Sequence, residues 1–259
     1  MKLGLCTIAA GDHPIETVAS TAVEAGYAGI EVWGRGHLGD GSEAACRSVR
    51  EAALDNGLEI PVYGSYLRPG TDGFDAMDEE LEITDRLGAS LIRVWAGNEE
   101  YQDRSDEHWE RTVADLQTLS ERAGVNGIGV TVEKHEGTLT NTQEGARRLI
   151  EAVDHPNCGL NWQPLFGLKP DVVLEEAHEL ASLSNNVHIQ AVPESGRPPD
   201  ERCLLEDAFF DVPAVIDAFD AAGFDGYVEV EFVTDDLAFE DAAERDRAYL
   251  ESILAARDE

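Results

Sequence analysis

Residues 24–31 read EAGYAGIE, and the same pattern returns as RLGASLIR at residues 86–93 and as AAGFDGYVE at residues 221–229. Each copy combines the end of an amphipathic helix, a glycine, a short loop and the start of an apolar strand. The glycine stands where a helix C-terminus favours a left-handed residue. A helix joined to a strand by so short a loop is the repeating unit of a parallel β/α protein.

Eight strand candidates, each a short run rich in β-branched residues, follow one another through the chain. The predicted strands are 2–8, 29–33, 59–63, 91–96, 129–133, 158–162, 186–190 and 227–232. Amphipathic helices are expected between them, near 14–26, 42–57, 72–88, 105–124, 141–153, 170–183, 212–223 and 237–256. This alternation predicts a parallel sheet covered by helices.

A closed barrel fits this pattern better than an open sheet. An open doubly wound sheet would favour a glycine-rich phosphate loop after the first strand, and Gly11-Asp12-His13-Pro14 is not one. The chain has 259 residues, which is the usual length of a (β/α)8 TIM barrel. No linker is found, so residues 1–259 are expected to form a single barrel domain.

The charge balance is extreme, with 53 acidic and 19 basic residues and a formal net charge of −34. The carboxylates alternate with regular apolar positions along the whole chain, which is typical of a folded, halophilic protein that works in very high salt. Such a field repels nucleic acid phosphates and anionic lipid headgroups, so neither partner is expected. The N-terminus lacks signal-peptide features and no run of about 20 apolar residues occurs, so the expected location is cytoplasmic.

The same charge predicts that folding depends on salt. We expect the chain to unfold in dilute buffer, because at about 0.01 M salt the Debye length grows to about 30 Å and the carboxylates repel one another. In molar KCl the chain should stay folded. Thermal unfolding followed by circular dichroism over a KCl series checks this expectation, and full thermal stability at low ionic strength would contradict it.

Polar side chains gather at the predicted C-terminal ends of four successive strands, which is where TIM barrels place their sites. They are Glu133, Gln163, His188 with Gln190, and Glu231. Carboxylate and amide oxygens together with an imidazole suit a divalent ion such as Mg²⁺ or Mn²⁺. Each residue alone is more often an ordinary polar residue in so acidic a chain, but the set from four strands favours a metal site.

These strand ends resemble the xylose isomerase-like barrel superfamily of sugar isomerases and epimerases. The resemblance covers essentially the whole chain and rests on residues 29–31 (GIE), 133–135 (EKH), 159–162 (GLNW) and 224–231 (FDGYVEVE). A narrower segment, residues 188–193 (HIQAVP) followed by Arg197, is similar to the hydroxypyruvate isomerase branch.

The resemblance implies a divalent metal and an isomerase or epimerase that acts on a small carbohydrate-like substrate through an enediolate. Glu133 and Glu231 would bind the metal and exchange the substrate proton on the two faces of the reacting carbon. Gln190 would be the metal ligand from strand seven, or His188 if the register slips. Arg197 would orient a substrate carboxylate or hydroxyl, and a homo-oligomer is expected.

Four further residues are candidates for substrate contact. Glu31 points into the barrel mouth if side chains alternate along its strand. Trp33 and Trp95 lie at strand ends, where they could stack on a sugar ring or pack at the rim. His135 follows strand five and either touches substrate or belongs to a solvated loop.

The chain departs from its relatives at Gln163, where the family usually has Asp, and at Phe166, where it often has His. A neutral amide should weaken a metal site. Two alternatives therefore stay open: an inosose-dehydratase-like lyase, which loses water after the same enolisation, and a metal-poor barrel that binds a metabolite without catalysis. A DNA repair enzyme of the endonuclease IV type needs about three metals, and neither the ligands nor the charge favours it.

Overall fold

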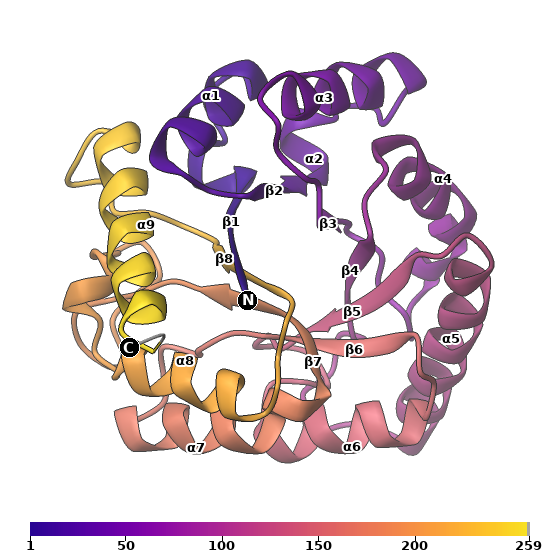
Figure 1. Cartoon of the computed structure of the whole chain (residues 1–259). Helices are drawn as coiled ribbons and strands as arrows, with labels where there is room; N and C mark the ends of the chain where they lie inside the picture. The colour runs from indigo at the N-terminus through magenta and orange to yellow at the C-terminus, as the bar shows by residue number, and fades with distance from the viewer. Residues whose placement is uncertain (258–259) are drawn as a thin grey trace.

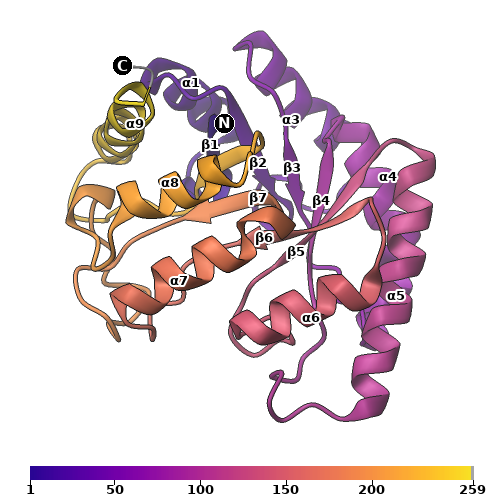
Figure 2. The ribbon, with the colours of Figure 1, turned by 60° about the horizontal axis from the view of Figure 1, so that its bottom comes forward.

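The computed structural model describes residues 1–257, apart from the side chain of Arg35. Eight parallel strands close into a barrel in chain order, and the last strand pairs with the first. Figure 1 shows the helices as a ring around the strands, and Figure 2 shows from another side how the helices of the second half lie over their strands. The predicted (β/α)8 TIM barrel is confirmed.

The elements have the following bounds. The strands are β1 (Lys2–Cys6), β2 (Gly29–Trp33), β3 (Val62–Gly64), β4 (Leu91–Trp95), β5 (Gly129–Glu133), β6 (Cys158–Trp162), β7 (Ser184–Ile189) and β8 (Tyr227–Val230). The α-helices are α1 (Ile15–Ala25), α2 (Gly34–His37), α3 (Glu43–Asp55), α4 (Met77–Leu87), α5 (Asp106–Val125), α6 (Gln143–Val153), α7 (Pro170–Leu180), α8 (Val212–Ala221) and α9 (Phe239–Ala255). Short 3₁₀ helices are η1 (Thr7–Ala10), η2 (Asp72–Ala76), η3 (Ala181–Leu183) and η4 (Leu205–Asp207).

Strands β2, β5 and β6 begin and end at the predicted residues, whereas strand β3 does not. The prediction of 59–63 was wrong, because the strand runs from Val62 to Gly64. Pro61 has no N–H to give to a ladder, so Glu59 makes only an isolated bridge to Gly29. The helix predicted over 72–88 is also divided, into η2 and α4.

The two faces of the barrel wall differ in polarity. Along β5, Val130 and Val132 belong to the apolar core between strands and helices, whereas Thr131 and Glu133 alternate with them and point inward. The same alternation fills the inside of the barrel with buried polar residues, among them Glu31, Arg93, Asn161, Asn186, His188 and Glu229. Buried polar groups need partners, so the inside of the barrel must be a hydrogen-bonded network.

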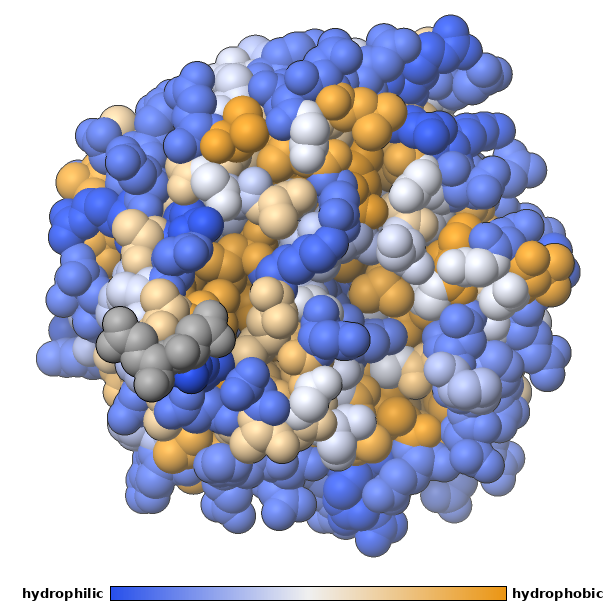
Figure 3. Space-filling model, in the orientation of Figure 1, coloured by the Kyte–Doolittle hydropathy of each residue, from blue (hydrophilic) through white to orange (hydrophobic). Residues whose placement is uncertain are grey.

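The many charged residues of the chain predict a hydrophilic surface. Figure 3, in the orientation of Figure 1, shows hydrophilic residues over most of the outer rim of this face, with hydrophobic residues nearer the middle. Among the described residues, none of the helices combines the length and the apolar character that crossing a bilayer requires.

Asp246 of α9 holds the long segment that leads from β7 to α8. Its Oδ1 accepts a hydrogen bond from the backbone N–H of Leu205 (2.8 Å), while its Oδ2 is buried without a hydrogen-bond partner. Burial raises the pKa of this carboxyl from 3.8 to about 7. The ionised form is therefore disfavoured in the folded protein.

Replacing Asp246 with asparagine should stabilise the protein at high pH. In the native protein this carboxyl favours folding at pH values below 3.8, and that contribution is lost as the pH rises through about 7. The asparagine amide keeps an acceptor for Leu205 and does not ionise. Asp246→Asn should thus gain up to about 4 kcal/mol over the native protein above pH 8 and little in acid.

Urea unfolding in molar KCl across pH 4 to 9 measures this difference. Asp241→Asn, an exposed change on the same helix, serves as the matched control. A stability difference for Asp246→Asn that does not grow with pH would contradict the prediction.

Candidate active site

The carboxylates of Glu133 and Glu231 meet at the C-terminal mouth of the barrel. Glu133 is the last residue of β5, and Glu231 follows β8, where its backbone N–H donates to the carbonyl of Ile189 (3.0 Å). One oxygen of each carboxylate and a ring nitrogen of His188 all lie within 4.8 Å of one another. A cavity of about 500 Å³ opens above, and both glutamates line it. The structure thus brings together side chains that are nearly a hundred residues apart in the sequence.

Three donors fix the carboxylate of Glu133. Its Oε2 accepts hydrogen bonds from Arg93 Nη1 and Trp95 Nε1, both at 2.6 Å, and its Oε1 accepts one from Gln163 Nε2 at 2.8 Å. A carboxylate that accepts several hydrogen bonds, one of them from a cation, is held in one orientation.

Arg93 joins Glu133 to Glu31 inside the barrel. Its Nε lies 3.4 Å from Glu31 Oε1, and all three side chains are buried. A Cβ at Gly64 of β3 would lie 2.7 Å from both Arg93 Nη2 and Glu31 Oε1, so only a glycine leaves room for the pair. Burial opposes the charge on Arg93, but the charges of Glu133 and Glu31 prevail and raise its pKa.

Sequence reasoning missed Arg93. It is the one charged residue in the run LIRVW of β4, and a lone charge within a buried strand is a signal that could have found it.

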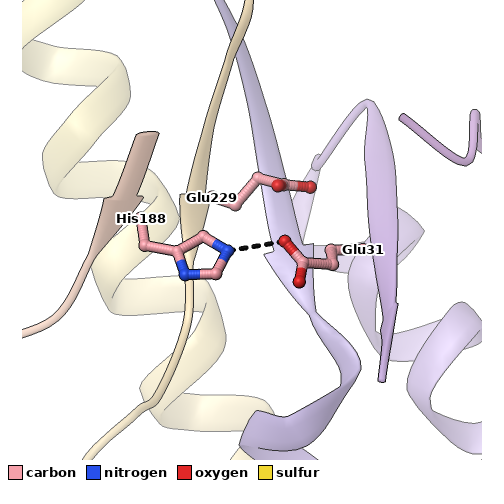
Figure 4. A group of neighbouring side chains, drawn as sticks. All are labelled: Glu31, His188 and Glu229. Carbon is pink, nitrogen blue, oxygen red and sulfur yellow. Dashed lines mark hydrogen bonds and ion pairs between the residues drawn. The ribbon is translucent and has the colours of Figure 1, made fainter. Parts of the chain in front are cut away.

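A deeper layer of the barrel holds His188 beside the carboxyl groups of Glu31 and Glu229 (Figure 4). His188 Nε2 lies 2.5 Å from Glu31 Oε2. Burial would lower the pKa of His188, but the charges of Glu31 and Glu231 and the hydrogen bond that His188 donates to Glu31 raise it to about 10. Burial would likewise raise the pKa of Glu31, and the charge and hydrogen bond of His188 lower it to about 2. The two residues form a buried ion pair when no metal is bound.

Glu229 completes this deeper layer. Burial and the charge of Glu31 raise its pKa well above 4.5, and Asn186 Nδ2 donates to its Oε2 at 2.8 Å. The deeper layer thus sets a carboxyl group with increased proton affinity beside the ion pair of His188 and Glu31.

Glu231 differs from Glu133 in its surroundings. Its Oε2 accepts a hydrogen bond from Gln190 Nε2, and its Oε1 lies 3.6 Å from His188 Nδ1. Burial raises the pKa of Glu231, opposed by the charge of His188 and assisted by that of Glu133. The surroundings of Glu231 thus increase its affinity for a proton.

The remaining candidates divide between the cavity and its surroundings. Trp95, His135 and Arg197 line the cavity with the two glutamates, and the rings of Trp95 and His135 are 5.3 Å apart. Trp33 lines a neighbouring cavity of about 480 Å³. Glu31 is fully buried in the deeper layer and contacts His188 instead of the cavity.

The described part of the chain contains two clusters in which carboxylates surround a histidine, and a divalent cation fits one of them. In the group of Glu133, His188 and Glu231 the two glutamates line the cavity, whereas no member of the group of Glu31, His188 and Glu229 lines it. Two buried atoms beside Glu231, His188 Nδ1 and Gln190 Oε1, have no hydrogen-bond partner, and a bound cation would take the place of the proton on Nδ1. Metal-binding histidines characteristically give their other nitrogen to a carboxylate, as His188 does to Glu31.

Gln163 fits such a site less well than the other predicted ligands. Its Nε2 donates to Glu133 Oε1 and to the carbonyl of Lys134, and its Oε1 accepts from Gln190 Nε2 at 3.1 Å. In this arrangement the amide of Gln163 supports Glu133 and Gln190.

The family model of the xylose isomerase-like TIM barrel matches residues 19–254. The chain belongs to this family. A curated relative, the 3-dehydroshikimate dehydratase of Bacillus anthracis, is 28% identical over 170 residues. The match covers 62% of this chain and 61% of the relative, so the chain spans less than two thirds of that protein.

Solved structures of the xylose isomerase-like TIM barrel share the fold over almost the whole chain. The probable 3-DHS dehydratase AsbF from Bacillus anthracis has a TM-score of 0.78 at 19% identity, covering 97% of this chain and 99% of its own. The IOLI protein with a binding zinc atom has a TM-score of 0.84 at 17% identity, covering 99% of both chains. An L-ribulose 3-epimerase has a TM-score of 0.78 at 18% identity, covering 98% and 95%. A dehydratase and an epimerase are thus among the proteins that this chain resembles.

Proposed function

We propose that this protein removes a proton beside the carbonyl of a small polyhydroxylated substrate and returns it, acting as a metal-dependent isomerase or epimerase. The observation that carries the proposal is the convergence of Glu133 and Glu231 on one cavity from strands far apart in the sequence. Proton transfer to and from carbon needs an acid or base within reach of the proton, and a carboxyl group can serve as either. Two such groups at one mouth can serve two positions of the same planar intermediate.

The surroundings of the two glutamates suit different parts of that reaction. The increased proton affinity of Glu231 suits it to act as a base, because a proton acceptor works best when its pKa is near the operating pH. Glu133, held by Arg93, Trp95 and Gln163, cannot turn away and stays directed at the cavity. Trp95 also forms part of the cavity wall and keeps water from one side of the substrate.

Glu133, Glu231 and His188, with the amide oxygen of Gln190, would hold a divalent metal, for which we propose Mn²⁺ or Mg²⁺. As a Lewis acid the metal would polarise the substrate carbonyl and so acidify the neighbouring C–H. Glu31 keeps the ring of His188 in place by its hydrogen bond to Nε2.

Dehydration is the second candidate, favoured by the sequence relative that is a 3-dehydroshikimate dehydratase. The first step is the same, because Glu231 takes the proton and the C–H electrons move toward the carbonyl. A C–O bond next to the enolised carbon then breaks, a C=C bond forms, and the departing hydroxide takes a proton to leave as water. We propose that His135, which lines the cavity, supplies that proton.

A mass-resolved substrate screen tests the proposal. The protein, purified in molar KCl, is stripped of metal with a chelator and then supplied with Mn²⁺ or Mg²⁺ in deuterated water. The panel contains ketoses, hydroxypyruvate, inososes and 3-dehydroshikimate. An isomerase or epimerase gives a product with the substrate's formula and one solvent deuterium on carbon, whereas a dehydratase gives a product lighter by one water. If neither exchange nor product appears and no metal binds, the barrel is a metabolite-binding protein and the proposal is wrong.

A further inference from the structure

Arg202 reaches the cavity from the long segment between β7 and α8. It is half-buried, and its guanidinium carbon lies 3.6 Å from the centroid of the Phe232 ring. Phe232 follows Glu231 directly in the sequence, and Arg202, Phe232 and Glu231 line the same cavity. The guanidinium is therefore fixed beside the position where the substrate would react.

Arg202 has no carboxylate partner within the described residues, although the chain contains 53 acidic residues. Its Nε is buried and makes no hydrogen bond. Glu231, Asp200 and Asp235 affect its pKa from longer range, and burial, the larger influence, lowers that pKa. A buried donor without an acceptor costs free energy, so an acceptor from outside the chain is expected.

The two other arginines of the cavity are already neutralised. Arg93 is paired with Glu133 and Glu31 inside the barrel. Arg197 lies on the same segment as Arg202, but its Nη2 is 2.9 Å from Glu194 and its Nη1 is 3.0 Å from Glu201. The family resemblance implied Arg197 as the substrate-orienting residue. In the structure Arg197 is held in two ion pairs, whereas no carboxylate among the described residues pairs with Arg202.

We propose that Arg202 binds an oxyanion of the substrate, a carboxylate or a phosphate, and so makes the enzyme specific for an anionic hydroxy-carbonyl compound. The proposal rests on the proposed function for the identity of the reacting end. A guanidinium offers a planar set of N–H donors that matches both oxyanions, and stacking on Phe232 holds that plane. In a chain with a net charge of −34, such a cation is needed to hold an anion at the mouth of the barrel.

Binding of matched probes tests this assignment without turnover. The probes are 3-dehydroshikimate with its methyl ester, and D-ribulose 5-phosphate with D-ribulose. Isothermal calorimetry in molar KCl gives Kd for each probe with the metal-loaded protein. We expect the anionic member of one pair to bind about tenfold more tightly than its neutral partner. The pair that shows this preference identifies the oxyanion as carboxylate or phosphate.

Arg202→Met keeps an unbranched apolar side chain against Phe232 and removes the charge. It should abolish the preference and leave the Kd of the neutral probe within about twofold, while Arg202→Lys should retain part of the preference. Arg47→Met, which removes an exposed arginine paired with Glu43 on α3, is the matched charge control. Equal binding of both members by the native protein, no binding of either, or an unchanged preference in Arg202→Met would overturn the proposal. Because none of these results depends on product formation, they are separate from the outcome of the substrate screen.

Discussion

Replacing Glu231 with glutamine should lower kcat on the order of a thousandfold while the barrel stays folded. Glutamine has the shape of glutamate, and its amide oxygen can still accept the hydrogen bond from Gln190. It cannot take a proton from carbon, and proton transfer by a positioned group contributes this much to a rate. The measurement is kcat with the substrate found by screening, together with the circular dichroism spectrum in molar KCl.

Two further variants complete the experiment. Glu79→Gln removes one exposed carboxylate from α4, far from the cavity, and should leave kcat unchanged. Glu133→Gln should lose turnover as Glu231→Gln does, and it should also lose stability, because Glu133 compensates the charge of Arg93. If both cavity variants keep full activity, the proton-transfer roles proposed for the glutamates are wrong.

Replacing Arg93 with methionine should cost about 3–5 kcal/mol of unfolding free energy. Methionine fills much of the same volume but leaves Glu133 and Glu31 without their shared cation, although both stay buried. An uncompensated buried charge is strongly destabilising, whereas a surface ion pair contributes about 1 kcal/mol or less. Urea unfolding at constant molar KCl measures the loss.

Arg86→Met is the matched control for this prediction. Arg86 pairs with Glu82 on the exposed side of α4, at 2.8 Å. The control should stay within about 1 kcal/mol of the native protein. An Arg93→Met protein as stable as this control would show that the buried pair is not required by the fold.

Most of the fold could be predicted from the sequence, because each β/α unit carries its own local signals. The helix, glycine and strand at residues 24–31 need no knowledge of the rest of the chain. The third strand failed because one local feature, the missing N–H of Pro61, outweighed the apolar pattern around it. The division of the helix predicted over 72–88 could not be predicted either, because the periodicity of apolar residues does not distinguish a 3₁₀ turn from an α-helical one.

The candidate site could be predicted only in part. The position of a residue at a strand end can be seen in the local sequence, whereas its contacts with residues of other strands cannot. Glu133 and Glu231 follow from their positions in two strands. The contact of Arg93 with Glu133 depends instead on the register of β4 against β5, in which Trp95 lies beside Glu133. Arg202 lies on a segment without periodic pattern, so nothing in the sequence places it above Glu231. Glu31 was expected at the mouth, and the structure places it one layer lower, where it orients His188.

The hydrogen bond from Trp95 to Glu133 has a practical consequence. The indole of Trp95 lines the cavity and touches one of the proposed reacting groups, whereas Trp162 is fully buried and packs against Phe219 behind the strands. Indole fluorescence depends on local polarity and on neighbouring charge, so a ligand that displaces water from the cavity should change the emission of Trp95 and leave that of Trp162 constant. The fluorescence emission of Trp95 should therefore report ligand binding, so ligands can be sought by titrating the unlabelled protein.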